Sequence, residues 1–239
     1  YLQMFSEVVR DKRPRNVFVY GPTGVGKTVG THLVLDRVRE DAEEIDGVNV
    51  RAVQLECRDL NTSYQVAVHL VNVLREPTPR SSISTTGYPE GDVYDMLFDE
   101  LRDADVTHVL IALDEIDNIG TSDEILYSIP RAKSNDNIPK EMHLSVIGIS
   151  NNFKFRDNLS PKVKDTLFDE EIHFAPYDAN QLCSILERRA DQAFKQGVLE
   201  DGVISLCAAN AAQDKASARQ ALRYLYKAGK LASNTGDDT

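Results

Sequence analysis

The sequence contains, at residues 21–28, the run Gly21-Pro22-Thr23-Gly24-Val25-Gly26-Lys27-Thr28, which has the spacing of a phosphate-binding loop. The apolar run 16–20 before it predicts a buried strand, and a helical pattern follows from Lys27 to about residue 40. Glycines let backbone N–H groups surround phosphates, while Lys27 reaches the β and γ phosphates and Thr28 ligates Mg²⁺. We therefore expect all eight residues to bind ATP or ADP with Mg²⁺.

The pattern outside this loop alternates between strands and helices. Short apolar runs predict further strands at 48–55, 108–113, 143–149 and 171–174. Helical patterns lie between them, at about 62–74, 93–102 and 122–128, with a long Pro-, Ser- and Thr-rich loop at 75–92. This α/β alternation predicts a parallel five-stranded sheet with helices on both faces. We assign residues 1–177 to this domain.

The chain becomes wholly helical after residue 177. Three helices are predicted, at about 178–194, 202–213 and 217–231, and they form a small all-α lid domain at 178–239. Arg219 lies near the N-terminal end of the third helix, where the helix dipole slightly disfavours a cation. A phosphate contact would explain that position, although a surface arginine is the alternative. We also expect Tyr177, directly before the lid, to bind the nucleotide.

Acidic and amide side chains follow two of the predicted strands. Asp114 and Glu115 end the run 108–113, so Asp114 is expected to hold Mg²⁺ and Glu115 to polarise the attacking water. The alternative is an acidic pair that merely ends a strand. Asn151 follows the strand 143–149 and is our choice to orient the water, with Asn152 as the alternative. An ordinary turn would also explain this Asn pair.

Composition limits the other classes of function. The net charge is −11, with 30 acidic and 19 basic residues in 1–177 and 8 of each in 178–239. Such a balance opposes nonspecific binding to nucleic acid and is typical of proteins that stay soluble in high salt. Apolar runs of about five residues are far shorter than a membrane span, so we expect a cytoplasmic protein without a membrane partner. Four basic residues near the fifth strand could touch DNA or a neighbouring subunit's nucleotide, or be solvated: Lys154, Arg156, Lys162 and Lys164.

Cysteine and histidine give no sign of a metal centre. The three cysteines share no short spacing, and the five histidines are scattered along the chain. We therefore expect free thiols and neither a zinc site nor a nucleophilic triad.

Together these motifs resemble AAA+ ATPases, with Walker A at 21–28, Walker B at Asp114-Glu115, sensor 1 at Asn151 and sensor 2 at Arg219. The segments "CRDLNTSYQVAVHLVNVLR" and "VIGISNNFKFRDNLSPKVKDTL" are similar to archaeal origin-recognition and cell-division-control initiator proteins. The resemblance implies a slowly hydrolysing ATPase that binds duplex origin DNA and helps recruit the replicative helicase, together with other initiator subunits.

The resemblance also implies two DNA-binding elements, and the sequence departs from the family at two positions. An insertion helix near 60–74 would grip DNA, and a winged-helix domain beyond Thr239 would supply most DNA contacts. Thr166 stands where eukaryotic relatives carry an arginine finger, and Ala216 stands where glycine is usual. Two alternatives remain: a clamp-loader-like AAA+ ATPase, or a non-hydrolysing nucleotide switch that acts as an interaction module.

Overall fold

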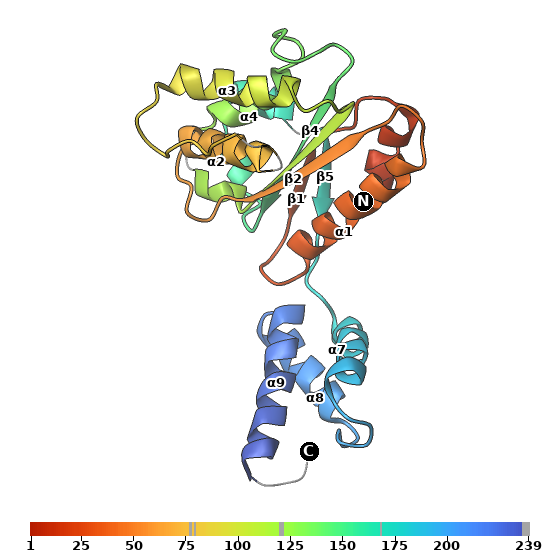
Figure 1. Cartoon of the computed structure of the whole chain (residues 1–239). Helices are drawn as coiled ribbons and strands as arrows, with labels where there is room; N and C mark the ends of the chain where they lie inside the picture. The colour runs from red at the N-terminus through yellow and green to blue at the C-terminus, as the bar shows by residue number, and fades with distance from the viewer. Residues whose placement is uncertain (77, 79, 120–121, 168, 236–239) are drawn as a thin grey trace. The chain divides into compact units, whose positions relative to one another are not determined.

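The chain folds into two compact units, which are described separately. The computed structural model describes residues 1–76, 78, 80–119, 122–167 and 169–235. The sheet unit comprises Tyr1–Tyr20 and Thr28–His173, and the helical unit comprises Gly21–Lys27 and Phe174–Thr239 (Figure 1). The phosphate-binding loop thus groups with the C-terminal helices by its contacts. The division at residue 177 stays a prediction.

The sheet has five parallel strands in the order β2-β3-β4-β1-β5. The strands are β1 (Val17–Tyr20), β2 (Val50–Glu56), β3 (His108–Asp114), β4 (His143–Ser150) and β5 (Glu170–His173). The prediction of a parallel five-stranded sheet is confirmed, with strand ends shifted by one or two residues. Because β4 lies between β3 and β1, the residues that follow these three strands emerge at one edge. Sites in parallel sheets are usually built at this carboxyl edge.

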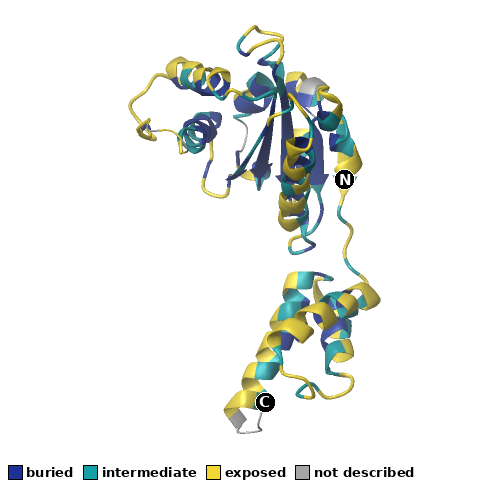
Figure 2. Ribbon diagram, turned by 45° about the vertical axis from the view of Figure 1, so that its right-hand side comes forward, coloured by how far each residue is buried: buried dark blue, intermediate teal, exposed yellow. Residues whose placement is uncertain are grey.

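Helices cover both faces of the sheet, as predicted (Figure 1). The sheet unit holds α1 (Lys27–Glu43), α2 (Ser63–Arg75), α3 (Glu90–Arg102), α4 (Glu124–Arg131), α5 (Phe155–Asn158), α6 (Pro161–Leu167) and three short 3₁₀ helices (Leu2–Phe5, Val8–Arg10 and Ile116–Ile119). Helix α1 lies on one face, and α2, α3 and α4 lie on the other. All seven residues of β3 are buried, as expected for a central parallel strand covered on both sides (Figure 2).

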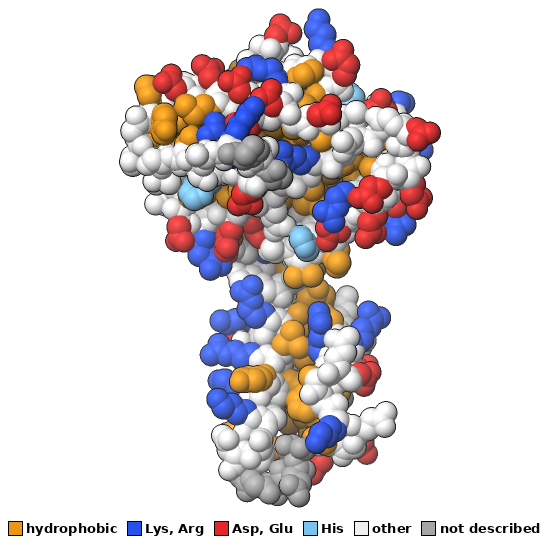
Figure 3. Space-filling model, in the orientation of Figure 1, with side chains coloured by type: hydrophobic (Ala, Val, Ile, Leu, Met, Phe, Trp, Pro, Cys, Tyr) orange, Lys and Arg blue, Asp and Glu red, His pale blue; other side chains and the backbone are white. Residues whose placement is uncertain are grey.

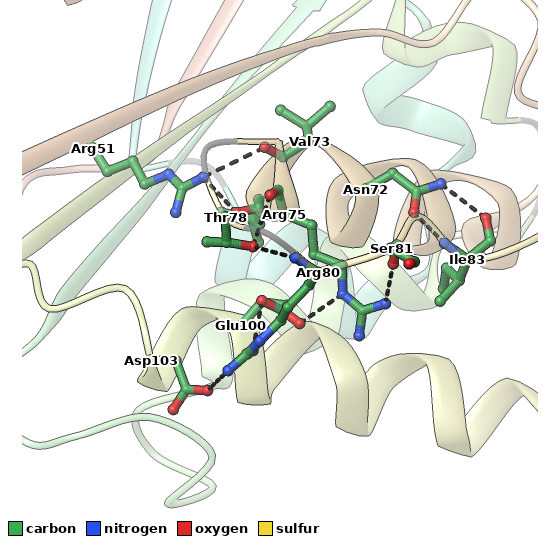
Figure 4. A network of polar contacts seen from close by, with 11 residues as sticks. Arg51, Asn72, Val73, Arg75, Thr78, Arg80, Ser81, Ile83, Glu100 and Asp103 are labelled. Carbon is green, nitrogen blue, oxygen red and sulfur yellow. Dashed lines mark hydrogen bonds and ion pairs between the residues drawn. The ribbon is translucent and has the colours of Figure 1, made fainter.

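The long connection between α2 and α3 is fixed to both helices (Figure 4). Glu100 of α3 accepts hydrogen bonds from Arg75 Nε at 2.7 Å and from Arg80 Nη1 at 2.9 Å. Asn72 bonds both the backbone N–H and the carbonyl of Ile83, at 2.7 and 3.1 Å. These contacts anchor the segment at residues 80–83 to the helix pair.

The helical unit contains the three predicted helices, α7 (Ala179–Ala193), α8 (Val203–Asp214) and α9 (Ala218–Thr235). Asp178 begins α7 through a capping box with Gln181. The core of this unit is apolar, with Leu182, Leu186 and Leu225 all buried at its centre. No helix among the described residues is long and apolar enough to cross a bilayer.

Candidate nucleotide-binding site

The glycines of residues 21–28 adopt backbone conformations that other residues avoid. Gly24 and Gly26 have φ angles of +84° and +92°, in the left-handed region. A Cβ atom on Gly24 would lie 3.0 Å from Arg219 Cβ, and one on Gly21 would lie 2.2 Å from the Phe174 carbonyl oxygen. The loop therefore needs glycine both for its curvature and for the close approach of Phe174 and Arg219.

Lys27 is buried inside this loop, with 6% of its surface exposed. Its Nζ atom donates to the carbonyl oxygens of Gly21 and Pro22, both at 2.8 Å. The Tyr177 hydroxyl donates to the Val25 carbonyl at 2.8 Å, so this predicted nucleotide-binding residue contacts the loop backbone. The ammonium group is thus held within the curve of the loop, where a cation that binds phosphates is expected.

Arg219 lies beside the loop at the start of α9. Its backbone N–H points to the Gly24 carbonyl at 3.5 Å, and its side chain is exposed. Ala216, two residues before the start of α9, has a φ angle of +48°. An alanine in the left-handed region is strained, which gives a physical reason why glycine is usual there. The structure brings Arg219 to the loop, and its role stays a prediction.

Thr28 and Asp114, the two residues expected to ligate Mg²⁺, are in contact in the sheet unit. Thr28 Oγ1 donates to Asp114 Oδ2 at 2.6 Å, and the other carboxylate oxygen accepts from the Glu115 N–H at 2.9 Å. Asp114 is 8% exposed. Hydroxyl and carboxylate oxygens are the hard donors that Mg²⁺ prefers. The oxygen atoms of Thr28 and Asp114 therefore fit Mg²⁺.

Glu115 follows β3 in a strained conformation, with a φ angle of +54°. Such strain in a non-glycine residue is common at functional sites. Arg58 donates to both carboxylate oxygens of Glu115, from Nε at 3.1 Å and from Nη2 at 3.2 Å. These hydrogen bonds, followed by the charges of Glu115 and Glu56, raise the pKa of Arg58. The expected water-polarising carboxylate is thus held by an arginine.

Arg58 was missed by the sequence reasoning. It follows β2, and the register pairs Glu56 of β2 with Asp114 of β3. Arg58, two residues after the end of β2, therefore lies beside Glu115, one residue after the end of β3. The order of the strands was the signal that could have found it, because neighbouring parallel strands end at the same edge.

Asn151 follows β4, the strand between those of the loop and of Asp114. Asn152 uses its Oδ1 atom to accept from the Lys154 N–H at 3.0 Å, which is the geometry of a local Asn turn. Ser150 Oγ donates to Asp117 Oδ1 at 2.9 Å. Asn152 is thus engaged in a local turn, and the role of Asn151 as the water-orienting residue stays a prediction.

The basic residues near β5 have local partners. Arg156 forms an ion pair with Glu171, and Lys162 pairs with Glu124 at 2.8 Å. Lys162 also lies over the Tyr127 ring, 4.8 Å from its centroid. These contacts support the solvated-face interpretation of the cluster. The side chain of Thr166, expected in place of an arginine finger, lies outside the described residues.

Two of the scattered histidines meet at the opposite edge of the sheet. The register pairs His108 with His143, and their side-chain ligand atoms lie within 4.8 Å of each other and of Asp11. Burial is the main cause that lowers the pKa of His108 and of His143. Both ring nitrogens of His108 are hydrogen-bonded, to Thr107 Oγ1 and to the Lys12 carbonyl. This cluster is therefore satisfied by groups of the protein.

Comparisons with known proteins agree with this geometry. Residues 10–156 match the AAA domain, and residues 183–239 match the Cdc6 AAA+ ATPase-type lid domain. The chain is 51% identical to "ORC1-type DNA replication protein 1" of Haloarcula marismortui, in an alignment that covers 100% of this chain and 59% of that protein. It is 50% identical to "ORC1-type DNA replication protein 11" of the same organism, over 100% of this chain and 56% of that protein.

A solved structure shows the same likeness. The structure of the Aeropyrum pernix ORC1 protein in complex with DNA matches with a TM-score of 0.84 and 35% identity, over 98% of this chain and 58% of that one. The chain spans a little more than half the length of these relatives. It belongs to the AAA domain family, within the archaeal ORC1/Cdc6-type branch of AAA+ proteins.

Proposed function

We propose that this chain is the ATP-binding and slowly hydrolysing part of a replication initiator, which binds origin DNA and helps recruit the replicative helicase. One observation carries the nucleotide part of the proposal. Thr28, the last residue of the phosphate-binding loop, is hydrogen-bonded at 2.6 Å to Asp114 at the end of β3. This is the pair of oxygen ligands that a P-loop NTPase uses for Mg²⁺.

Each residue of the site has a distinct task in this proposal. The loop backbone and Lys27 bind the phosphates. Glu115 polarises the attacking water, and Asn151 orients that water. Thr28 and Asp114 would hold Mg²⁺, which would supply positive charge to the phosphate oxygens. Arg219 would contact the γ-phosphate, so Arg219→Ala should weaken discrimination between ATP and ADP.

A matched pair of acidic variants tests the Mg²⁺ assignment. Asp114→Asn should remove the Mg²⁺ dependence of ATP binding, because an amide is a weaker ligand for a hard cation. Asp117→Asn, three residues further along, should retain it, since Asp117 is bonded to Ser150. ATP affinity measured with and without EDTA distinguishes the two variants. An unchanged Mg²⁺ dependence in Asp114→Asn would reject the assignment.

A second function, a non-hydrolysing nucleotide switch, is favoured by one observation. Arg58 holds both oxygens of Glu115, the group that hydrolysis requires. Steady-state phosphate release separates the two functions. Turnover that falls by orders of magnitude in Glu115→Gln supports hydrolysis, whereas wild-type turnover no faster than that of Glu115→Gln supports the switch.

The DNA part of the proposal is supported by the relatives. The curated relatives are DNA replication proteins by name, and the Aeropyrum pernix ORC1 structure contains DNA. Because this chain carries a charge of −11, we expect it to bind duplex weakly, in the range of roughly 10⁻⁴ to 10⁻⁶ M typical of nonspecific contacts. Such a protein would work in the cytoplasm.

Binding by two lengths of the protein, measured at the same salt concentration, tests the DNA part. The chain alone should show weak binding, and the longer protein from the same gene should bind origin duplex more tightly than random duplex. Absence of any preference for origin sequence in the longer protein would reject the initiator assignment and leave the nucleotide site intact.

A further inference from the structure

The outer face of α9 carries a stripe of cations. Arg223, Lys227 and Lys230 are exposed, and their spacing of four and three residues places them on one face of the helix. Tyr226 lies between them with 67% of its surface exposed. These four residues are called the lid stripe. In Figure 3, Lys and Arg side chains follow one edge of the helical unit.

The lid stripe contrasts with the charge of the rest of the chain. No Asp or Glu occurs between residues 215 and 236, although the chain as a whole has a charge of −11. Ion pairs between described residues all lie between positions 15 and 171, and examples are Arg37 with Asp41 and Arg75 with Glu100. Within the described part of the chain, the stripe cations are therefore not neutralised by a nearby carboxylate.

The dimensions of the lid stripe suit a nucleic-acid backbone. A rise of about 1.5 Å per residue separates Arg223 and Lys230 by roughly 10 Å along the helix. Phosphates of one DNA strand follow one another at about 3.4 Å along the duplex axis, so roughly three phosphates fit beside the stripe. Tyrosine hydroxyls are common donors to phosphate oxygens, and Tyr226 offers one at the centre of the cations.

We propose that the lid stripe binds the sugar–phosphate backbone of duplex DNA. The inference rests on the proposed DNA binding and adds a contact surface in the helical unit, separate from the nucleotide residue Arg219. A row of exposed cations with no nearby carboxylate among the described residues fits a regular polyanion, and the exposed Tyr226 hydroxyl adds a neutral donor to the same row.

Two triple variants of equal charge test the proposal. The stripe variant carries Arg223→Gln, Lys227→Gln and Lys230→Gln, and the control carries Arg37→Gln, Arg39→Gln and Lys140→Gln on exposed positions of the sheet unit. Both change the net charge from −11 to −14. Fluorescence anisotropy with a labelled 30-bp random duplex gives the affinity of each protein between about 0.1 and 0.5 M KCl. Thermal unfolding and ATP affinity confirm that each variant is folded.

The expected effect follows from counterion release. The slope of log K against log[salt] is negative, and each lost phosphate contact reduces its magnitude by about 0.9. The magnitude of the slope for the stripe variant should therefore be smaller than that for wild type by up to about 2.7. With 1 M salt as the reference, the same relation gives a loss of DNA affinity of about fourfold per contact at 0.2 M salt. For three contacts the loss of DNA affinity is roughly 70-fold. The control should keep the wild-type slope.

Each other outcome overturns the proposal in a recognisable way. Equal losses in both variants would mean that total charge, not the lid stripe, governs binding, and the chain would still be a DNA-binding protein. If the wild-type protein shows no DNA binding at 0.1 M KCl, both the proposal that this chain binds DNA and the proposal for the lid stripe are rejected. A stripe variant that keeps DNA affinity but loses affinity for a labelled poly-glutamate peptide would assign the surface to an acidic protein.

Discussion

Replacing Glu100 by Gln should destabilise the sheet unit by about 2–3 kcal/mol. The Glu100 side chain is 4% exposed and accepts from both Arg75 and Arg80 (Figure 4). A hydrogen bond to a charged group contributes roughly 1.5–3 kcal/mol, and breaking a buried ion pair costs roughly 3–5 kcal/mol. Because the Arg75 and Arg80 side chains are 16% and 46% exposed, both can regain water. The expected loss therefore lies at the lower end.

Thermal unfolding measures this loss. For a chain of this size, about 2–4 °C of Tm corresponds to 1 kcal/mol, so Glu100→Gln should lower Tm by about 5–10 °C. Asp103→Asn is the matched control, because Asp103 pairs with the same Arg80 but is 56% exposed. Its effect should stay within about 0.5 kcal/mol. A Tm for Glu100→Gln equal to that of Asp103→Asn would refute the view that a buried carboxylate anchors the connection between α2 and α3.

Three further predictions concern single side chains. Arg58→Ala should raise ATP turnover at saturating ATP, because the substitution releases the Glu115 carboxylate. Phosphate release measures this turnover, and slower turnover in the variant would show that Arg58 assists the reaction. Burial raises the pKa of Cys57 to about 12, so under native conditions at pH 8 a thiol reagent should label the half-buried Cys183 and spare Cys57; labelling of Cys57 at an equal rate would contradict this. Burial lowers the pKa of His108, so the unfolded state binds a proton at this residue more readily than the folded state does. The free energy of unfolding should therefore fall as the pH drops below about 6.5, and the fall should be smaller in His108→Gln. Urea unfolding measures this, and the same pH dependence in wild type and His108→Gln would reject the reasoning.

The parts of the fold that the sequence predicts are those encoded locally. The strand β3 is predictable because residues 109–113 form a continuous apolar run and the acidic pair Asp114-Glu115 comes directly after that run. The spacing of residues 21–28 likewise carries its own structural requirement, since Gly24 and Gly26 need positive φ angles. The helix ends are less well predicted, and α3 begins at Glu90, three residues before its expected start. Tertiary contacts set such boundaries, and sequence periodicity does not contain them.

Contacts between distant segments were beyond prediction from the sequence. The bond between Arg58 and Glu115 joins residues 57 positions apart, and the pairing of His108 with His143 depends on the register of two parallel strands. Both follow from strand order, which alternation of strands and helices leaves open. The same holds for Glu100, a single acid in an amphipathic helix, whose burial depends on where the next connection folds back.

The central claim, that residues 21–28 with Glu115 form a working nucleotide site, is tested most directly by ATP affinity in two variants. Isothermal titration calorimetry with Mg²⁺ should show no measurable ATP binding for Lys27→Ala, because the buried ammonium is the cation that reaches the phosphates. Glu115→Gln should bind ATP as wild type does, since it leaves the loop unchanged. Equal ATP affinity in wild type and Lys27→Ala would contradict the account.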